Sequence, residues 1–114
     1  MSQDYRLARA SEMDWAPTRR AGIRQKALFG PDQPTHQNLI LVDYDPDADV
    51  ELHAIGVPES IFVVSGSVRI IGPEGEDDLA AEDAVYFDPG SSHGLKAGPE
   101  GARCLVVFSP AGPS

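Results

Sequence analysis

The chain has 114 residues, the length of one ordinary domain, and 41 % of them are apolar, which excludes wholesale disorder. Its net charge is −9 and no apolar run approaches the roughly 20 residues of a membrane helix, so we expect neither a nucleic-acid nor a membrane partner. The first ten residues are too polar for a signal peptide, and we therefore expect a cytoplasmic protein.

The charge is divided unevenly along the chain. Residues 1–26 hold six basic and three acidic residues, a net charge of +3, whereas residues 27–114 hold three basic and fifteen acidic residues, a net charge of −12. This basic N-terminal segment is complementary to the acidic body of its own chain or of another copy. Because a small β-protein also has edge strands to cover, we expect a homodimer in which the segment packs on the sheet of the other subunit.

The helical signal is confined to one turn at residues 10–15, where Ser11 is the expected N-cap and Pro17 ends the turn. The rest of the chain has the apolar alternation or the short apolar runs of strands, with turn residues such as Ser65-Gly66 and Gly72–Gly75 between them. The expected strands cover residues 22–28, 37–44, 50–54, 61–64, 68–71, 84–87, 92–96 and 103–108. This pattern predicts an all-β fold, a single antiparallel sandwich or barrel.

Three further residues or segments can be interpreted from the sequence. The chain has one cysteine, Cys104, which cannot form an internal disulfide and lies in an apolar run, so we interpret it as a buried small hydrophobic residue. Residues 110–114 are expected to form a loose tail. His36 lies at the start of an expected strand and is interpreted as an exposed residue rather than a ligand.

Two turn-bounded segments carry the residues suited to chemistry. In the first, His53 is followed by Glu59 and then, after six residues, by Gly66; in the second, Gly90 is followed after two residues by His93. These spacings resemble the two sequence motifs of the cupins, small antiparallel β-barrels that often hold one divalent metal. The resemblance covers roughly residues 48–108, the two-motif barrel core, and assigns His53, Glu59 and His93 as metal ligands.

The sequence also departs from those motifs. Ile55 stands where the first motif has its second histidine, Glu82 replaces the opening glycine of the second motif, Asp88 replaces its proline and Ala97 its final asparagine. The stretch 15–28 is weakly similar to the cupin half of zinc-dependent anti-sigma factors. The resemblance as a whole implies one cupin domain over residues 1–114, a jelly roll or double-stranded β-helix of about ten short strands.

The three candidate ligands can also be interpreted by their chemistry alone. Two imidazoles and one carboxylate on one side of an ion form the facial triad typical of non-haem Fe(II) oxygen chemistry, and the same donors accept Mn, Ni or Zn. We therefore expect one divalent transition metal, with Fe(II) favoured. Ile55 supplies no donor, which lowers the expected affinity and leaves one more position for substrate, water or O₂.

Strand periodicity raises a question about Glu51. If His53 points inward, Glu51 and Asp49 point the same way unless a bulge intervenes. Glu51 could then be a substitute ligand or an outer-shell acceptor for His53; the alternative is that Asp49 and Glu51 lie at the exposed start of the strand.

These observations predict a metal-dependent enzyme of dioxygenase type that acts on a small organic molecule. Two alternatives remain open. One is a non-oxidative isomerase, epimerase or cyclase; the other is a metal-free or metal-sensing module that binds a small ligand.

Overall fold

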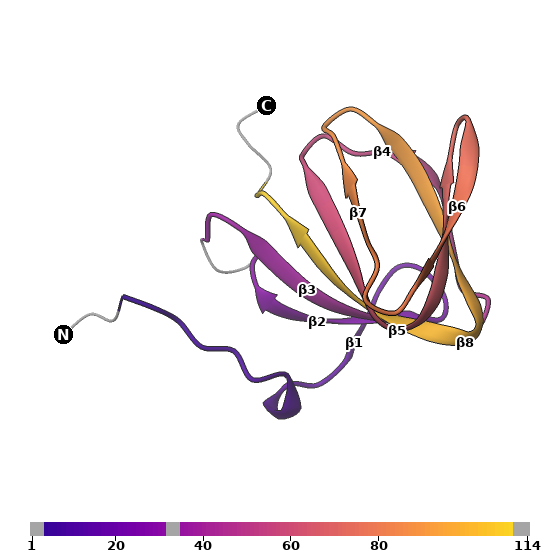
Figure 1. The fold of residues 1–114 in the computed structure, drawn as a ribbon. Coiled ribbons are helices and arrows are strands. Elements are labelled where there is room, and N and C mark those ends of the chain that lie inside the picture. The colour runs from indigo at the N-terminus through magenta and orange to yellow at the C-terminus, as the bar shows by residue number, and fades with distance from the viewer. Residues whose placement is uncertain (1–3, 32–34, 111–114) are drawn as a thin grey trace.

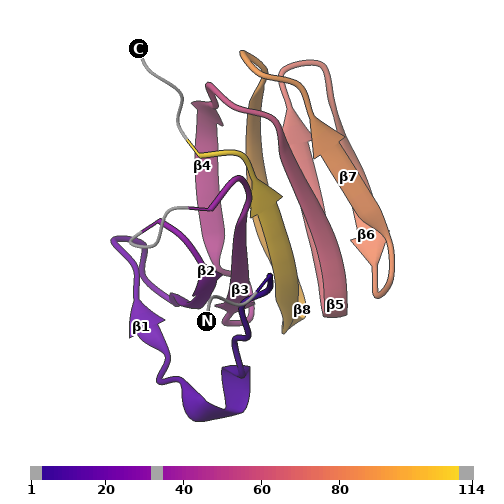
Figure 2. The ribbon, with the colours of Figure 1, turned by 90° about the vertical axis from the view of Figure 1, so that its left-hand side faces the viewer.

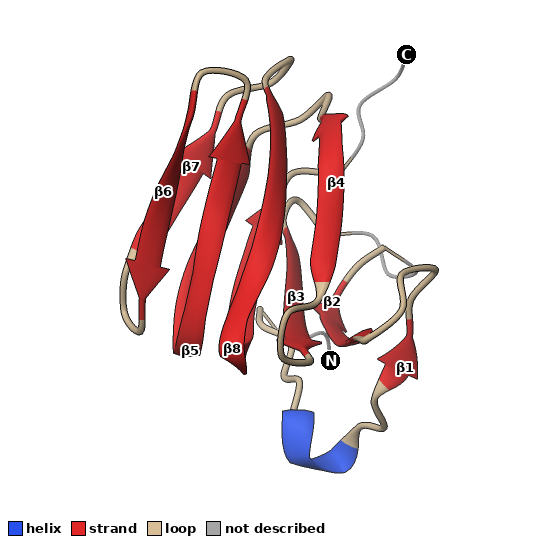
Figure 3. Ribbon diagram, turned by 90° about the vertical axis from the view of Figure 1, so that its right-hand side faces the viewer, coloured by secondary structure: helices blue, strands red, loops and turns tan. Residues whose placement is uncertain are grey.

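The computed structural model describes residues 4–31 and 35–110 as an antiparallel β-structure with one short 3-10 helix (Figures 1 and 3). The elements are η1 (Ala10–Glu12), β1 (Ala16–Pro17), β2 (Ile23–Phe29), β3 (Asn38–Tyr44), β4 (Asp49–Ala54), β5 (Glu59–Gly72), β6 (Gly75–Ala80), β7 (Ala84–Phe87) and β8 (Ser92–Phe108). Within these ranges no helix has the length and apolar character needed to cross a membrane.

Two long strands, β5 and β8, divide the sheet into two halves. Residues 102–108 of β8 pair with β3, and residues 59–62 of β5 pair with β7, which gives a larger half in the order β1-β2-β3-β8-β5-β7. Residues 92–96 of β8 pair with β4, and residues 67–72 of β5 pair with β6, which gives a smaller half, β4-β8-β5-β6. The halves diverge from the bend in β5 and β8 as an open barrel (Figure 1).

Glycines at the bend let both long strands change direction without ending. Gly66 and Gly101 have φ of 77° and 79°, and β5 shifts register against β8 between Val63 and Ser65 and again between Gly66 and Val68. The predicted turn at Ser65-Gly66 is therefore wrong, because the chain bends through bulges while β5 and β8 stay paired on both sides. For the same reason, the two strands expected at 92–96 and 103–108 are one strand.

The structure confirms the predicted fold class and one predicted turn, and it corrects the predicted helix cap. The all-β antiparallel class is confirmed, although the described residues form eight strands rather than about ten and the sheet is not closed. The turn Gly72–Gly75 closes the β5–β6 hairpin as predicted. Ser11 is not the cap of η1, since Arg9 holds the N-cap position and makes no side-chain capping bond.

The core lies between the two halves. Its buried apolar members are Ile23, Ile40, Val42, Tyr44, Ile61, Val63, Val68, Ile70, Phe87, Leu95, Ala97, Ala102, Cys104 and Val106. Cys104 is fully buried, as expected, and burial raises the pKa of its thiol to about 12. Of the expected tail, residues 111–114 lie outside the described residues.

The N-terminal segment is attached to its own chain through Trp15. The Lys26 ammonium lies 4.6 Å and the Arg103 guanidinium 5.1 Å from the indole centroid, and Lys26 Nζ donates to the carbonyl oxygen of Ala10 at 2.7 Å. In Figure 2 the dark indigo part of the segment runs down to η1, makes a turn there and rises into β1. The side chain of Leu7, before this anchor, is exposed.

We propose that the N-terminal segment contacts a second copy of the chain, because Tyr5 and Leu7 are exposed and residues 1–26 carry net positive charge opposite an acidic body. Light scattering at tens of micromolar should then give twice the chain mass of 12.2 kDa. Deleting residues 1–9 should weaken the dimer, whereas deleting the uncharged residues 111–114 should not. A monomer at these concentrations would contradict the proposal.

Candidate functional site

A cavity of about 540 Å³ lies between the two halves of the sheet. His53 on β4 and His93 on β8 line it from the smaller half, and Glu59 at the start of β5 lines it from the larger half. Most of the remaining wall is apolar, including Ile23, Ile40, Val42, Val50, Ile61, Leu95, Val106 and Phe108. The three residues singled out by their sequence spacing thus face one cavity.

A bulge in β4 decides which side chains reach this cavity. Val50 pairs with Leu95 and His53 with His93, so three residues along β4 match two along β8. Val50 and His53 both line the cavity, whereas Glu51 between them does not. The alternation that would place the Glu51 carboxylate beside His53 is broken by this extra residue.

Glu51 instead acts on His53 through its backbone. Its carboxylate is 69 % exposed and pairs with Arg20 at 3.2 Å, whereas its carbonyl oxygen lies 3.0 Å from His53 Nδ1. A carbonyl only accepts, so this contact is a hydrogen bond when Nδ1 of His53 carries the proton. The Nε2 lone pair is then free for a cation, the usual arrangement for a metal-binding histidine.

His93 is held by packing and by Glu59. Its ring stacks on Phe87 at a centroid distance of 3.7 Å and an interplanar angle of 8°, and its Nε2 lies 3.3 Å from Glu59 Oε1. The rings of His53 and His93 are 4.9 Å apart. His93 Nδ1 is buried and has no hydrogen-bond partner among the described residues.

Burial sets the electrostatics of the site. Loss of water lowers the pKa of His93 to about 4, with a smaller lowering from the positive charge of His53, so the His93 imidazole is neutral at pH 7. Burial raises the pKa of Glu59, and His53 offsets part of that shift. Both pKa shifts favour the uncharged form of the side chain. A bound cation would favour the ionised form of Glu59 and so oppose the shift of its pKa.

His53, Glu59 and His93 are donor types that bind divalent ions, but their side chains are not grouped around one point. Across residues 4–31 and 35–110, no three His, Cys, Asp or Glu side chains are grouped as a metal site. Two neutral imidazoles and a carboxylate nevertheless line one cavity, and the unpartnered His93 Nδ1 shows that the protein alone leaves this donor set incompletely bonded.

The structure also locates Ile55 and His36, the two other positions considered in the sequence. Ile55 packs against the core, and its backbone binds the second motif segment, with its amide donating to the Ser91 carbonyl at 3.0 Å and its carbonyl accepting from Gly90 at 2.7 Å. The two motif segments are therefore fixed side by side. His36 is exposed and lies at a separate depression with Tyr5, away from the cavity.

The motif spacings did not indicate several polar residues of the cavity wall. Thr18, Arg20, Gln25 and Tyr44 come from the β1–β2 loop, β2 and β3, outside the range of the motif resemblance. Only the alternation in the strand at 22–28 could have pointed to an inward Gln25, and no local signal marks Arg20 or Thr18.

Comparison with known proteins bears on the fold. No protein-family model and no curated protein matches the sequence. Among solved structures, KdgF from Halomonas sp. superposes with a TM-score of 0.82 at 20 % identity, covering 94 % of this chain and 96 % of that one. An RmlC-like cupin from Shewanella frigidimarina gives 0.81 at 21 % identity, covering 97 % and 96 %.

The polyketide cyclase RemF from Streptomyces resistomycificus also gives a TM-score of 0.81, at 20 % identity, over 100 % of this chain and 83 % of that one. Matches over nearly the whole chain establish its fold. The expected cupin jelly roll is confirmed, and residues 4–31 and 35–110 have the fold of small cupins.

Proposed function

We propose that the chain is a metal-dependent cupin enzyme of dioxygenase type that acts on a small organic molecule bound between the two halves of the sheet. One divalent ion, Fe(II) in preference to Mn, Ni or Zn, would be held by His53, Glu59 and His93. The observation that carries the proposal is that these three donors, from three different strands, line one cavity whose other walls are mainly apolar.

The surrounding residues support these roles. The Glu51 carbonyl holds the proton of His53 on Nδ1, and the Phe87 ring fixes the plane of His93. Burial keeps His93 neutral, so no proton has to leave that imidazole near pH 7 before it can act as a donor. Apolar walls exclude water from a bound molecule, and an ion there supplies Lewis acidity and positions for oxygen chemistry.

Three observations favour the alternative functions. Ile55 in place of a fourth donor and the absence of an assembled three-donor group in the described residues favour a ligand-binding module. The RemF match favours non-oxidative chemistry, since that protein is a polyketide cyclase with a similar fold. Metal content separates the binding module from both enzymes, and oxygen consumption separates the two enzymes.

Calorimetric titration of the metal-free protein tests the ligand set. We expect moderate affinity for at least one of Fe(II), Mn(II), Ni(II) and Zn(II). His53→Ala or His93→Ala should lower that affinity by about 100-fold or more, because each removes a direct imidazole donor and even the loss of an outer-shell partner costs about tenfold to 100-fold. Glu51→Gln should leave the affinity unchanged, because that carboxylate pairs with Arg20. If no ion binds more tightly than millimolar, the site is not a metal site.

Replacing Ile55 tests the missing donor. Residues 53 and 55 lie on the same face of the chain, so Ile55→His presents a second imidazole beside His53, and metal affinity should rise about tenfold. Ile55→Gln is the control, as it removes the same apolar contact without adding an imidazole. Equal affinities for the two variants would mean that position 55 does not face the ion.

A further inference from the structure

The cavity wall contains two cations that the proposed metal chemistry does not use. Arg19 and Arg20, in the loop between β1 and β2, line the same cavity as His53, Glu59 and His93; Arg19 is exposed, whereas Arg20 is partly buried. The Nε of Arg20 is buried and has no hydrogen-bond partner in the part of the chain that the structure describes. Among the described residues, the buried side-chain nitrogen and oxygen atoms that lack a hydrogen-bond partner are Arg20 Nε and His93 Nδ1. Both atoms belong to residues that line this cavity. Buried N–H groups are normally hydrogen-bonded, so an unpaired guanidinium N–H at this position indicates a missing acceptor.

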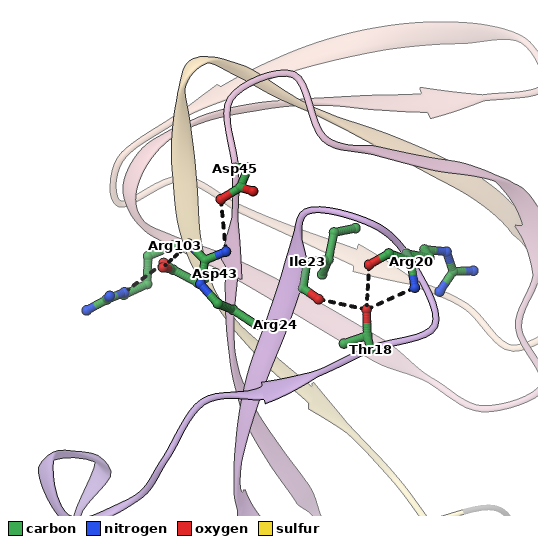
Figure 4. Close-up of polar contacts among 7 residues, drawn as sticks. All are labelled: Thr18, Arg20, Ile23, Arg24, Asp43, Asp45 and Arg103. Carbon is green, nitrogen blue, oxygen red and sulfur yellow. Dashed lines mark hydrogen bonds and ion pairs between the residues drawn. The ribbon is translucent and has the colours of Figure 1, made fainter.

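The loop holds Arg20 in place through Thr18. The Thr18 hydroxyl lies 2.8 Å from the Ile23 carbonyl and 3.1 Å from the Arg20 carbonyl, so its proton can be donated to either, and its oxygen accepts from the Arg20 amide at 3.1 Å. Figure 4 shows Thr18 at the centre of these three bonds. The backbone of Arg20 is therefore tied to the first residue of β2, which suits a side chain that must meet a ligand at a set position.

Two arginines of the adjoining strands, Arg24 and Arg103, are already neutralised. Arg24 pairs with Asp45 at 2.8 Å and with Asp43 at 3.1 Å, and Arg103 pairs with Asp43 at 3.1 Å (Figure 4). Neither of these arginines lines the cavity. Arg20 differs, since its Nη2 meets the exposed Glu51 while its buried Nε is unpaired.

From this arrangement we infer that Arg20 is a specificity-determining residue that binds the carboxylate of a small organic acid in the cavity. The inference rests on the proposed function in that it places this acid beside the three donor residues. A guanidinium edge matches a planar carboxylate, and the apolar walls suit the rest of the molecule. The Glu59 carboxylate in the same cavity disfavours a second negative charge, so the ligand class is a monocarboxylic acid with an apolar body.

Binding of a matched probe pair to the metal-free full chain tests the inference. Phenylacetate and phenylacetamide have nearly the same shape and differ in charge. In an NMR titration we expect phenylacetate to bind about 10- to 100-fold more tightly, the range for a hydrogen bond to a charged group. The Arg20 Nε–Hε signal, identified by its loss in Arg20→Gln, should shift with phenylacetate and not with the amide.

Variants separate this role from a structural one. Arg20→Gln should abolish the preference for the acid, whereas Arg9→Gln, which removes the same charge outside the cavity wall, should keep most of it. Glu51→Gln removes the carboxylate that competes for Arg20 and should strengthen phenylacetate binding; a purely structural ion pair would instead give weaker binding. Folding of each variant is checked from its amide spectrum.

Equal affinities for acid and amide, or a preference that survives in Arg20→Gln, would overturn the inference. Phenyl phosphate is a third probe, and binding of it without binding of phenylacetate would overturn the assignment to a carboxylate. Because these titrations contain no metal, their outcome is independent of the metal titration. An Arg20-dependent preference in a protein that binds no ion would support this inference and contradict the proposed function.

Discussion

Gly66→Ala should lower the free energy of unfolding by about 3 kcal/mol, the sum of a positive φ that L-residues disfavour and a backbone collision. Gly66 has φ of 77°, and a methyl group there would lie 2.8 Å from the Ala102 Cα and against the Gly101 carbonyl. These neighbours are backbone atoms of β8, which cannot rotate away as a side chain could. Urea denaturation followed by circular dichroism measures the effect.

Gly56→Ala is the matched control, since a methyl group at Gly56 meets nothing within 4 Å and its φ is not in the left-handed region. It should change stability by less than about 0.5 kcal/mol, as is usual for exposed substitutions. If Gly66→Ala were as stable as Gly56→Ala, the close approach of β5 and β8 at the bend would be wrong.

The same bend controls the site. Glu59 lies on the part of β5 in the larger half of the sheet, whereas His93 lies on the part of β8 in the smaller half. Their 3.3 Å contact therefore depends on the angle at Gly66 and Gly101. A variant that opens the bend should separate the carboxylate from the imidazole before it unfolds the chain.

The fold could be predicted from the spacing of a few residues in two separate segments of the chain. The prediction failed where one residue type is compatible with two local structures. The interval from Glu59 to Gly66 and the interval from Gly90 to His93 led to the cupin fold. The prediction of a turn at Ser65-Gly66 is wrong because a glycine with positive φ fits a tight turn and a bulge equally well. Which of the two forms depends on whether a partner strand, here β8, continues past it.

The candidate site shows the same limit. His53 and Glu59 were identified from motif positions, but the side of the strand that Glu51 occupies depends on a bulge with no sequence signature in β4. Arg20 lines the cavity and Phe87 stacks on His93 from outside the matched positions, and their contacts are set by tertiary packing. Nothing in a single sequence predicts such contacts.

Acid should destabilise the metal-free protein through His93. In the unfolded chain this histidine has its ordinary pKa of 6.5, whereas burial lowers the folded-state pKa to about 4. Above pH 6.5 neither state binds the proton on His93, and stability does not change with pH. As pH falls from 6.5 toward 4, the unfolded state binds this proton and the folded state does not, so the unfolded state becomes more favourable. The expected loss is about 2 kcal/mol by pH 5, measured by urea denaturation at pH 7.5, 6 and 5.

Glu59 acts in the opposite direction, and its removal provides the control. Its pKa is raised in the folded state, so the folded protein takes up this proton first and gains stability as pH falls. Glu59→Gln should therefore lose more stability between pH 7.5 and 5 than the unmodified protein, and His93→Gln should lose less. If all three lost the same amount, His93 would not be held neutral by burial. The expected difference means that the fold loses stability in acid because it keeps an uncharged imidazole beside a carboxylate, an arrangement that would suit the proposed cation better than it suits folding.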